Sequence, residues 1–180
     1  MPEMLDARGL TEAEAIERYR KSEYPRPGFT ADVVMFARDP EGLWLLLIRR
    51  GGHPFLGKLA LPGGFAEMGE TIEQTAAREL EEETGVTGIA PRLLGVYSRP
   101  GRDPRGWTVS AAYWTVVDRA RVKARAGDDA ADAGWYRLER EGSRIFFAKD
   151  GEREALEDMA FDHADIVSDA LCRLEEEDGR

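Results

Sequence analysis

Two apolar stretches joined by a short turn constrain the fold more than any other feature of the chain. Residues 31–38 read ADVVMFAR and residues 43–50 read LWLLLIRR, with DPEG as the turn between them. This pattern predicts two neighbouring strands. The second stretch is apolar on both faces as far as its paired arginines, which is typical of a strand in the middle of a sheet.

Helix patterns stand near both ends of the chain. TEAEAIERYRKSE, from Thr11, opens with a capping box of Thr11 and Glu14, and YPRPGF at 24–29 breaks the helix. An amphipathic pattern predicts a last helix over about 162–175. We therefore expect an N-terminal helical extension (1–23), one domain (24–176) and an acidic tail (177–180).

The remaining segments predict a fold in which a mixed sheet carries helices. Strand patterns occur at 92–99, 107–117 and 134–138, and polar loops are expected at 100–106 and 124–133. A long loop punctuated by glycines, residues 51–70, precedes a helix in the middle of the chain. A chain of 180 residues suits a single domain of the α/β (α+β) class.

The middle helix concentrates negative charge. Its sequence ends in RELEEETGV, and a capping-box pattern of Thr71 and Gln74 predicts a helix over about 72–84, with Gly85 as the left-handed residue that ends it. At about 100° per residue, Glu79, Glu82 and Glu83 share one face, whereas Glu81 points elsewhere. Like charges at this spacing repel, but three carboxylates supply the hard oxygen ligands that Mg²⁺ or Mn²⁺ prefers. Read alone, the segment is either a metal site or an exposed charged helix.

The residues before this helix favour the metal site. A glycine (Gly64), five residues, a glutamate (Glu70), seven residues and then RELEEETGV resemble the complete Nudix box, with every fixed position occupied over 23 residues. The resemblance implies a Nudix-type α/β/α sandwich with a mixed sheet. It also implies hydrolysis of a nucleoside diphosphate linked to another group.

The resemblance assigns roles to residues of the box. Glu79, Glu82 and Glu83 match the metal-binding glutamates of the family, and Gly64 matches a position whose backbone carbonyl joins the metal. Arg78 and Glu70 match a pair that orients this segment. The implied cofactor is Mg²⁺, with Mn²⁺ as a substitute, which neutralises the pyrophosphate and activates water.

A carboxylate is expected to accept the proton of that water, and Glu82, Glu83 and a loop residue are the candidates. Family members often use an acid from a loop before a late tryptophan-containing strand, and GDDAADAGW at 127–135 resembles that loop. Asp129 is the first candidate there, followed by Asp128. The alternative is that this segment is a polar surface loop.

Three segments outside the box resemble the small ADP-ribose pyrophosphatases, namely residues 24–36, 98–114 and 161–171. Pro100, about 15 residues beyond the box, fits the same branch. The resemblance implies Mg²⁺-dependent cleavage of ADP-ribose to AMP and ribose 5-phosphate. The alternatives are a pyrophosphatase for nucleoside triphosphates, including oxidised ones, and a non-catalytic regulator that senses ADP-ribose. Such regulators carry an added DNA-binding domain, whereas only a short acidic segment follows the last helix pattern here.

Arginines and aromatic residues are the candidates for substrate contacts. A guanidinium can bind phosphate oxygens with two hydrogen bonds, and the candidates are Arg26, Arg50, Arg102 and Arg105, with Arg49 beside them. The alternative is that these arginines are surface charge or pair with carboxylates of this acidic chain. Phe55, Tyr97 and Trp107 can either stack on adenine or belong to the core. His163 is expected to make a hydrogen bond at the start of a helix.

Charge and composition exclude several classes of partner. The net charge of −10 argues against non-specific binding to nucleic acid or an anionic membrane, and no apolar run approaches the length of a membrane span. Cys172 is the only cysteine, so no intramolecular disulfide can form. We expect a cytoplasmic protein whose partner is a small nucleotide substrate, and the resemblance is compatible with a homodimer.

Overall fold

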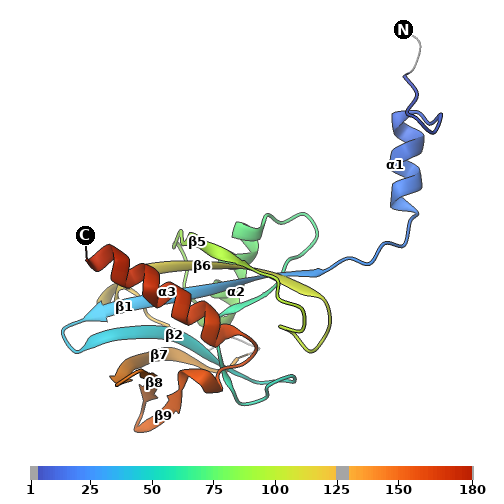
Figure 1. Cartoon of the computed structure of the whole chain (residues 1–180). Coiled ribbons are helices and arrows are strands. Elements are labelled where there is room, and N and C mark those ends of the chain that lie inside the picture. The colour runs from blue at the N-terminus through green and yellow to red at the C-terminus, as the bar shows by residue number, and fades with distance from the viewer. Residues whose placement is uncertain (1–3, 125–129, 180) are drawn as a thin grey trace.

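The computed structural model describes residues 4–124 and 130–179, with the backbone alone at 130 and 131. A mixed sheet forms the centre of the body, α3 crosses one of its faces and α2 lies against the other (Figure 1). The helices are α1 (Glu12–Arg20), α2 (Ile72–Thr84) and α3 (His163–Asp178), with short 3₁₀ helices η1 (Arg119–Arg121) and η2 (Leu156–Asp158). The expected α/β/α sandwich is confirmed.

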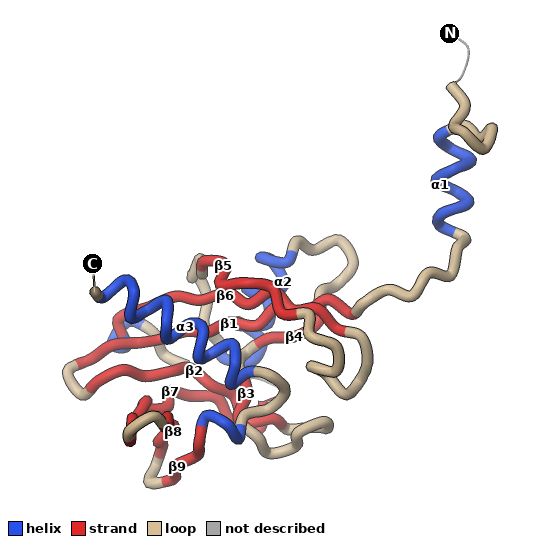
Figure 2. The backbone as a smooth tube through the Cα atoms, in the orientation of Figure 1, coloured by secondary structure: helices blue, strands red, loops and turns tan. Residues whose placement is uncertain are grey.

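The strands follow one another across the sheet in the order β5-β6-β1-β2-β7-β8-β9, while β3 pairs with β2 and β4 pairs with β1 (Figure 2). Their bounds are β1 Gly28–Asp39, β2 Gly42–Arg50, β3 Leu59–Ala60, β4 Gly63–Phe65, β5 Arg92–Tyr97, β6 Thr108–Asp118, β7 Ala130–Glu141, β8 Arg144–Lys149 and β9 Glu152–Ala155. Strands β1 and β6 run parallel, and the other pairs among the described residues are antiparallel.

On the edge away from β6, strand β1 divides its pairing between β2 and β4. Its end, residues 36–39, pairs with β2, whereas residues 30–32 pair with β4 in the register Ala31↔Gly64. Side chains along β1 alternate, so Val34 and Phe36 belong to the core beneath α3 and Val33 and Met35 to the core beneath α2. Burying such side chains contributes roughly 1.5–3 kcal/mol each. This core fixes the strand against which β4 is held.

Several sequence expectations are confirmed by the structure. The two apolar stretches form a hairpin, and β2 is an interior strand of the sheet. Helix α2 has the expected bounds, the capping box of Thr71 and Gln74 is present, and Gly85 has φ 68°. Its N–H donates to the carbonyl of Glu81 at 2.8 Å.

Other expectations were wrong. The segment 51–70 is not one continuous loop, because β3 and β4 interrupt it. Strands of two and three residues are too short to show a period. Residues 130–133, expected in a loop, begin β7, where they pair with the end of β2 across an irregularity at Arg49 and Arg50. The hairpin β8–β9 was missed, and α3 continues to Asp178 into the expected tail.

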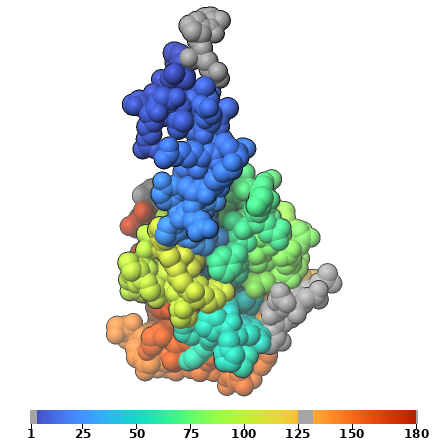
Figure 3. All heavy atoms as spheres, turned by 90° about the vertical axis from the view of Figure 1, so that its right-hand side faces the viewer, coloured from blue at the N-terminus to red at the C-terminus, as the bar shows by residue number. Residues whose placement is uncertain are grey.

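Helix α1 stands away from the body (Figure 3). All of its residues are described, and none of them is buried. Its capping box of Thr11 and Glu14 is present as expected. No helix within residues 4–124 and 130–179 has the length and apolar character needed to span a membrane.

Candidate active site

The acidic face of α2 lies directly against the backbone of β4. The N–H of Gly63 donates a hydrogen bond to Glu83 Oε2 at 2.9 Å. A Cβ built on Gly64 would lie 2.4 Å from the carboxyl carbon of Glu79, closer than such carbons approach one another in proteins. A Cβ on Gly63 would lie 2.2 Å from the carbonyl oxygen of Ala31. Glycine at 63 therefore allows β4 to lie against β1, whereas a side chain at 64 would displace the Glu79 carboxylate from this backbone.

Arg78 connects the carboxylates of this region. Its Nε and Nη2 donate to the two oxygens of Glu70 at 2.7 and 3.1 Å, and Nη2 also donates to the carbonyl of Phe65 at 3.0 Å. Its Nη1 donates to Glu79 at 2.7 Å and to Glu82 at 3.0 Å. The hydrogen bond from Arg78 lowers the pKa of Glu70 to about 2. The pairing of Arg78 with Glu70 expected from the sequence is thus present, and it ties the start of α2 to β4.

The surroundings of two glutamates, Glu79 and Glu83, disfavour the ionised form of their carboxyl groups. Burial raises the pKa of Glu83 to about 8, with further contributions from the carboxylates of Glu79 and Asp32, and the N–H of Gly63 opposes this shift. Burial also raises the pKa of Glu79, against the hydrogen bond from Arg78. The side chain of Glu82 is exposed. A cation beside these groups would remove the electrostatic cost of ionising them.

The carboxylate oxygens of this region suit a hard divalent cation, although they are not arranged around a common point. Among the described residues, no three acidic, histidine or cysteine side chains already converge as a metal-binding group. The Nη1 atom of Arg78 is instead the cation between Glu79 and Glu82. Carboxylate oxygens such as these, together with that of Glu83 beside Gly63, are the ligands that Mg²⁺ and Mn²⁺ prefer. Metal binding here would require Glu79 and Glu82 to turn away from Arg78.

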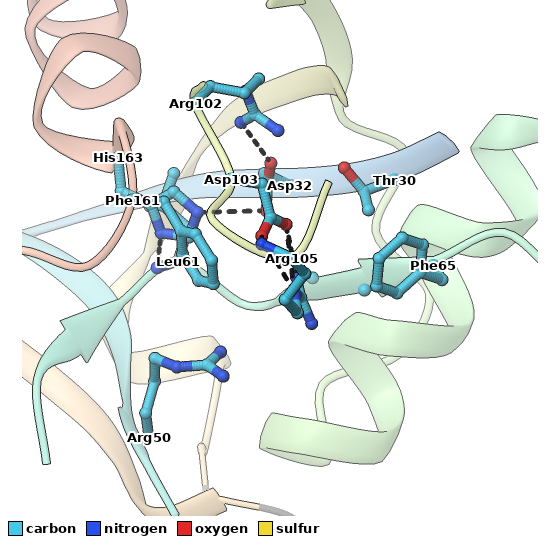
Figure 4. A pocket seen from close by; sticks show the side chains of 12 residues that line it. Thr30, Asp32, Arg50, Leu61, Phe65, Arg102, Asp103, Arg105, Phe161 and His163 are labelled. Atoms are coloured by element: carbon cyan, nitrogen blue, oxygen red, sulfur yellow. Dashed lines mark hydrogen bonds and ion pairs between the residues drawn. The ribbon is translucent and has the colours of Figure 1, made fainter. Parts of the chain in front are cut away.

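A pocket opens beside β4 (Figure 4). Its lining comes from β1, β2, β4, the loop 98–107 and the segment before α3, and consists of Thr30, Asp32, Arg50, Leu61, Gly63, Gly64, Phe65, Arg102, Asp103, Arg105, Phe161 and His163. Because Gly63 and Gly64 belong both to this lining and to the glutamate contacts, the pocket adjoins the acidic face of α2.

Two arginines and two phenylalanines stand together in this pocket. The guanidinium of Arg105 lies 4.8 Å from the ring centre of Phe65 and 5.2 Å from that of Phe161. Arg50 lies 4.9 Å from the ring centre of Phe161. Burial and then the neighbouring charge of Arg105 lower the pKa of Arg50. Two guanidinium groups that share one ring form a cationic wall suited to an anion.

The two arginines differ in their partners. Arg105 is paired with Asp103 at 2.7 Å. Arg50 donates from Nε to the carbonyl of Pro54 at 2.7 Å, and no ion pair joins it to a carboxylate in the part of the chain that the structure describes. Arg50 therefore retains donor capacity toward the pocket.

The other arginine candidates lie elsewhere or are engaged. Arg102 lines the pocket, but its guanidinium is buried and makes two hydrogen bonds to Asp162, at 2.9 and 2.7 Å. Arg49 pairs with Glu154 at 2.6 Å. Arg26 is exposed in the segment between α1 and β1, and it does not line this pocket. Arg50 and Arg105 are therefore the pocket arginines that a ligand can reach, since Arg105 keeps 42% of its side chain exposed despite its pair with Asp103.

The aromatic candidates for substrate contacts do not line this pocket. Tyr97 donates to Asp169 at 2.7 Å and thus connects β5 with α3. The ring of Phe55 packs edge-on against Phe161, with ring centres 4.8 Å apart. Trp107 is exposed. Asp128 and Asp129 lie outside the described residues.

Asp32 and Phe161 are pocket residues that the sequence analysis missed. Asp32 is buried in the structure, and the signal that could have identified it is an acidic residue inside the apolar stretch of β1. Phe161 has a positive φ of 54°, a backbone conformation that no pattern in the sequence predicts.

Comparison with known proteins decides the family. The profile of the NUDIX domain matches residues 27–159. The chain belongs to the Nudix family. The resemblance of the box is thereby confirmed, and members of this family generally require divalent metal ions.

Individual Nudix relatives match most of the chain. The ADP-ribose pyrophosphatase of Methanocaldococcus jannaschii is 42% identical over 156 residues, which cover 87% of this chain and 79% of that protein. The ADPR responsive transcriptional repressor NtrR of Acinetobacter baylyi is 31% identical over 167 residues, covering 91% of this chain and 61% of the repressor. The two relatives represent the catalytic and the regulatory alternatives.

A solved Nudix structure has the same fold. The NUDIX domain of Shewanella oneidensis NrtR, crystallised with ADP ribose, superimposes with a TM-score of 0.74 and 29% sequence identity. The match covers 92% of this chain and 99% of that one. The expected Nudix fold is therefore confirmed independently of the box.

Proposed function

We propose that this Nudix protein hydrolyses the pyrophosphate of ADP-ribose to AMP and ribose 5-phosphate with Mg²⁺, or Mn²⁺ in its place. The observation that carries the proposal is the continuity between the two halves of the site. The acidic face of α2 contacts Gly63 and Gly64, and the same glycines line a pocket with two arginines. A divalent cation and a diphosphate are the ligands that such a combination suits. The 42% identity to an ADP-ribose pyrophosphatase supports this choice of substrate.

The residues of the box would hold the metal. Glu79, Glu82, Glu83 and the carbonyl of Gly64 are the proposed ligands. A bound divalent cation supplies charge neutralisation at the pyrophosphate and lowers the pKa of water. To bind the metal, Glu79 and Glu82 would have to leave Arg78, whose bonds to Glu70 and to the carbonyl of Phe65 would keep β4 and α2 in register.

The pocket arginines would orient the substrate. Arg50 and Arg105 provide donors for phosphate oxygens, and stacking against Phe161 limits the freedom of both side chains. Arg102 acts on the substrate indirectly, because its donors are occupied by Asp162. Arg26 is a secondary candidate on the approach to the site. Asp129 is proposed to accept the proton of the attacking water, with Glu82 and Glu83 as the other carboxylates able to do so.

Product analysis tests this function. The protein is incubated with ADP-ribose and Mg²⁺, and the products are separated by chromatography. Equal amounts of AMP and ribose 5-phosphate are expected, and no turnover is expected in excess chelator. Intact ADP-ribose at the end of a long incubation with Mg²⁺ and Mn²⁺ would exclude the proposal.

The similarity to a transcriptional repressor supports one rival function, the sensing of ADP-ribose without turnover. The complete set of box residues favours catalysis instead, since a sensor does not need the metal-binding glutamates. A shift assay with DNA, run beside the product assay, separates the two. DNA binding without hydrolysis would support the regulator.

We further propose a cytoplasmic protein that binds neither nucleic acid nor membranes, since its net charge is −10.

We also propose a homodimer. Its support is α1, which presents Ile16 and Tyr19 to solvent and has no buried residue. Light scattering on the full chain and on a chain starting at residue 24 tests this assembly. Loss of the dimer on truncation is expected, and a monomeric full chain would exclude it.

A further inference from the structure

The loop that carries Arg105 is anchored by a buried ion pair. Nε of Arg102 donates to Asp162 Oδ2 at 2.9 Å and Nη2 donates to Oδ1 at 2.7 Å. Both side chains are only 4% exposed. Asp162 immediately precedes α3. The position of the loop 98–107 is thus determined by the start of a helix that is itself packed on the core of the sheet.

His163, the residue after Asp162, anchors the opposite side of the pocket. The N–H of Leu61 donates to Nδ1 of His163 at 2.9 Å. Leu61 is two residues before Gly63, so this bond holds the backbone that leads into β4. Burial lowers the pKa of His163, which keeps the ring neutral. Because Nδ1 accepts, the proton lies on Nε2, which is 3.5 Å from Asp32 Oδ1.

Asp32 joins the two anchors. The hydroxyl of Ser110 donates to Asp32 Oδ2, and Nη2 of Arg102 lies 3.7 Å from the same oxygen. The backbone of Asp32 pairs with that of Gly63. One buried carboxylate is therefore adjacent to the arginine loop, the start of α3 and the glycine strand (Figure 4).

We propose that Arg102 and Asp162 are positioning residues, which hold Arg105 over the pocket in register with the Gly63–Gly64 backbone. The reading of Arg105 as a phosphate ligand rests on the proposed function. Burying an ion pair costs so much desolvation that it adds little net stability, whereas its two-point geometry fixes the orientation of the loop. Neither residue needs to touch the substrate, because both act through Arg105.

The test compares the buried anchor with an exposed one. Arg102→Lys keeps the charge but loses the two-point geometry, and Asp162→Asn removes the partner charge. Arg99→Gln is the matched control, because Arg99 joins the same loop to α3 through an exposed pair with Asp165 at 3.1 Å. Thermal unfolding establishes that each variant is folded.

Hydrogen–deuterium exchange gives the first readout. Arg102→Lys and Asp162→Asn are expected to accelerate exchange in residues 99–107 by about tenfold, and Arg99→Gln to leave it unchanged. Unchanged exchange in both anchor variants would overturn the proposal, whatever their activity. If a single variant does not fold, Arg102→Met combined with Asp162→Leu removes both charges at similar volume. This double variant should fold with the same fast exchange, and slow exchange would contradict the inference.

Steady-state kinetics give the second readout. The KM for ADP-ribose should rise about tenfold in Arg102→Lys while kcat changes little, which corresponds to about 1.4 kcal/mol of binding free energy. In the background of Arg105→Gln, adding Arg102→Lys should have almost no further effect. Additive effects would show that Arg102 does not act through Arg105 and would overturn the proposal. Failure of the wild-type protein to cleave ADP-ribose would instead exclude the proposed function, and the exchange experiment would still decide the anchoring role.

Discussion

Gly64 and Glu79 are in such close contact that a Cβ on Gly64 would lie 2.4 Å from the carboxyl carbon of Glu79. A side chain at this position of β4 would therefore displace the carboxylate of one side chain of α2. The contact brings a backbone segment and a proposed metal ligand together, although 15 positions separate them in the sequence.

Replacing Gly64 should impair catalysis much more than folding. In Gly64→Ala, the new methyl group displaces the Glu79 carboxylate, and a shift of about 1 Å can cost roughly 10²-fold in kcat. Gly52→Ala is the control, because its Cβ would meet open space. Turnover of ADP-ribose and thermal unfolding are measured for both. Equal activity of the two variants would show that the contact is not needed.

Removing both carboxylates from the end of the metal face should abolish turnover with every substrate. In Glu82→Gln combined with Glu83→Gln, the site loses two charged oxygen ligands. The control is Glu81→Gln, which changes an exposed glutamate on another face of the same helix. Activity with Mg²⁺ and with Mn²⁺ is measured. Retained turnover in the double variant would refute the metal site.

The pKa of Glu83, raised to about 8 by burial, predicts a pH dependence of stability. The folded protein without metal keeps this proton up to about pH 8, whereas the unfolded chain releases it near the ordinary value of 4.5. The folded state thus binds more protons, so its stability falls as the pH rises from 7 to 8.5. The pKa of His163 is lowered, which places its titration below this range.

Differential scanning calorimetry in chelator and in Mg²⁺ tests this prediction. The gain in Tm from Mg²⁺ should be larger at pH 8.5 than at pH 7, since the metal binds the ionised carboxylates. Glu83→Gln should weaken the pH dependence in chelator. A wild-type Tm in chelator that stays constant or rises between pH 7 and 8.5 would contradict the expected environment of Glu83.

Asp129 is predicted to be the proton acceptor. Asp129→Asn keeps the size of the side chain and removes its basicity, so kcat should fall by about 10²–10⁴-fold while KM changes little. Asp128→Asn, the second candidate of the same segment, is measured beside it. A fully active Asp129→Asn variant would exclude this residue from the mechanism and transfer the role to Asp128, Glu82 or Glu83.

The sequence alone was sufficient for the elements that carry a period or a cap. Helix α2 could be bounded to the residue because Thr71 and Gly85 are local signals. The acidic face followed from the same helix, since three carboxylates at this spacing have to lie together. Strands β3 and β4 were not predictable, because their formation depends on pairing with β2 and β1 rather than on their own residues.

The pairing of Arg102 with Asp162 could not be predicted from the sequence. An arginine in a glycine- and proline-rich loop suggests a phosphate ligand equally well whether its guanidinium is free or paired. Its pairing with Asp162, 60 residues farther along the chain, depends on the packing of α3. Arg50 was nominated for the same general reason, and only the structure shows that it shares the ring of Phe161 with Arg105.

The central claim is tested most directly by the specificity constants of a substrate panel. ADP-ribose, NADH, a dinucleoside polyphosphate and nucleoside triphosphates, including an oxidised purine nucleotide, are compared with Mg²⁺ as the metal. A cationic pocket beside the glutamates proposed to bind the metal, together with the similarity to an ADP-ribose pyrophosphatase, predicts the largest kcat/KM for ADP-ribose. A nucleoside triphosphate that exceeds ADP-ribose by a wide margin would contradict the account.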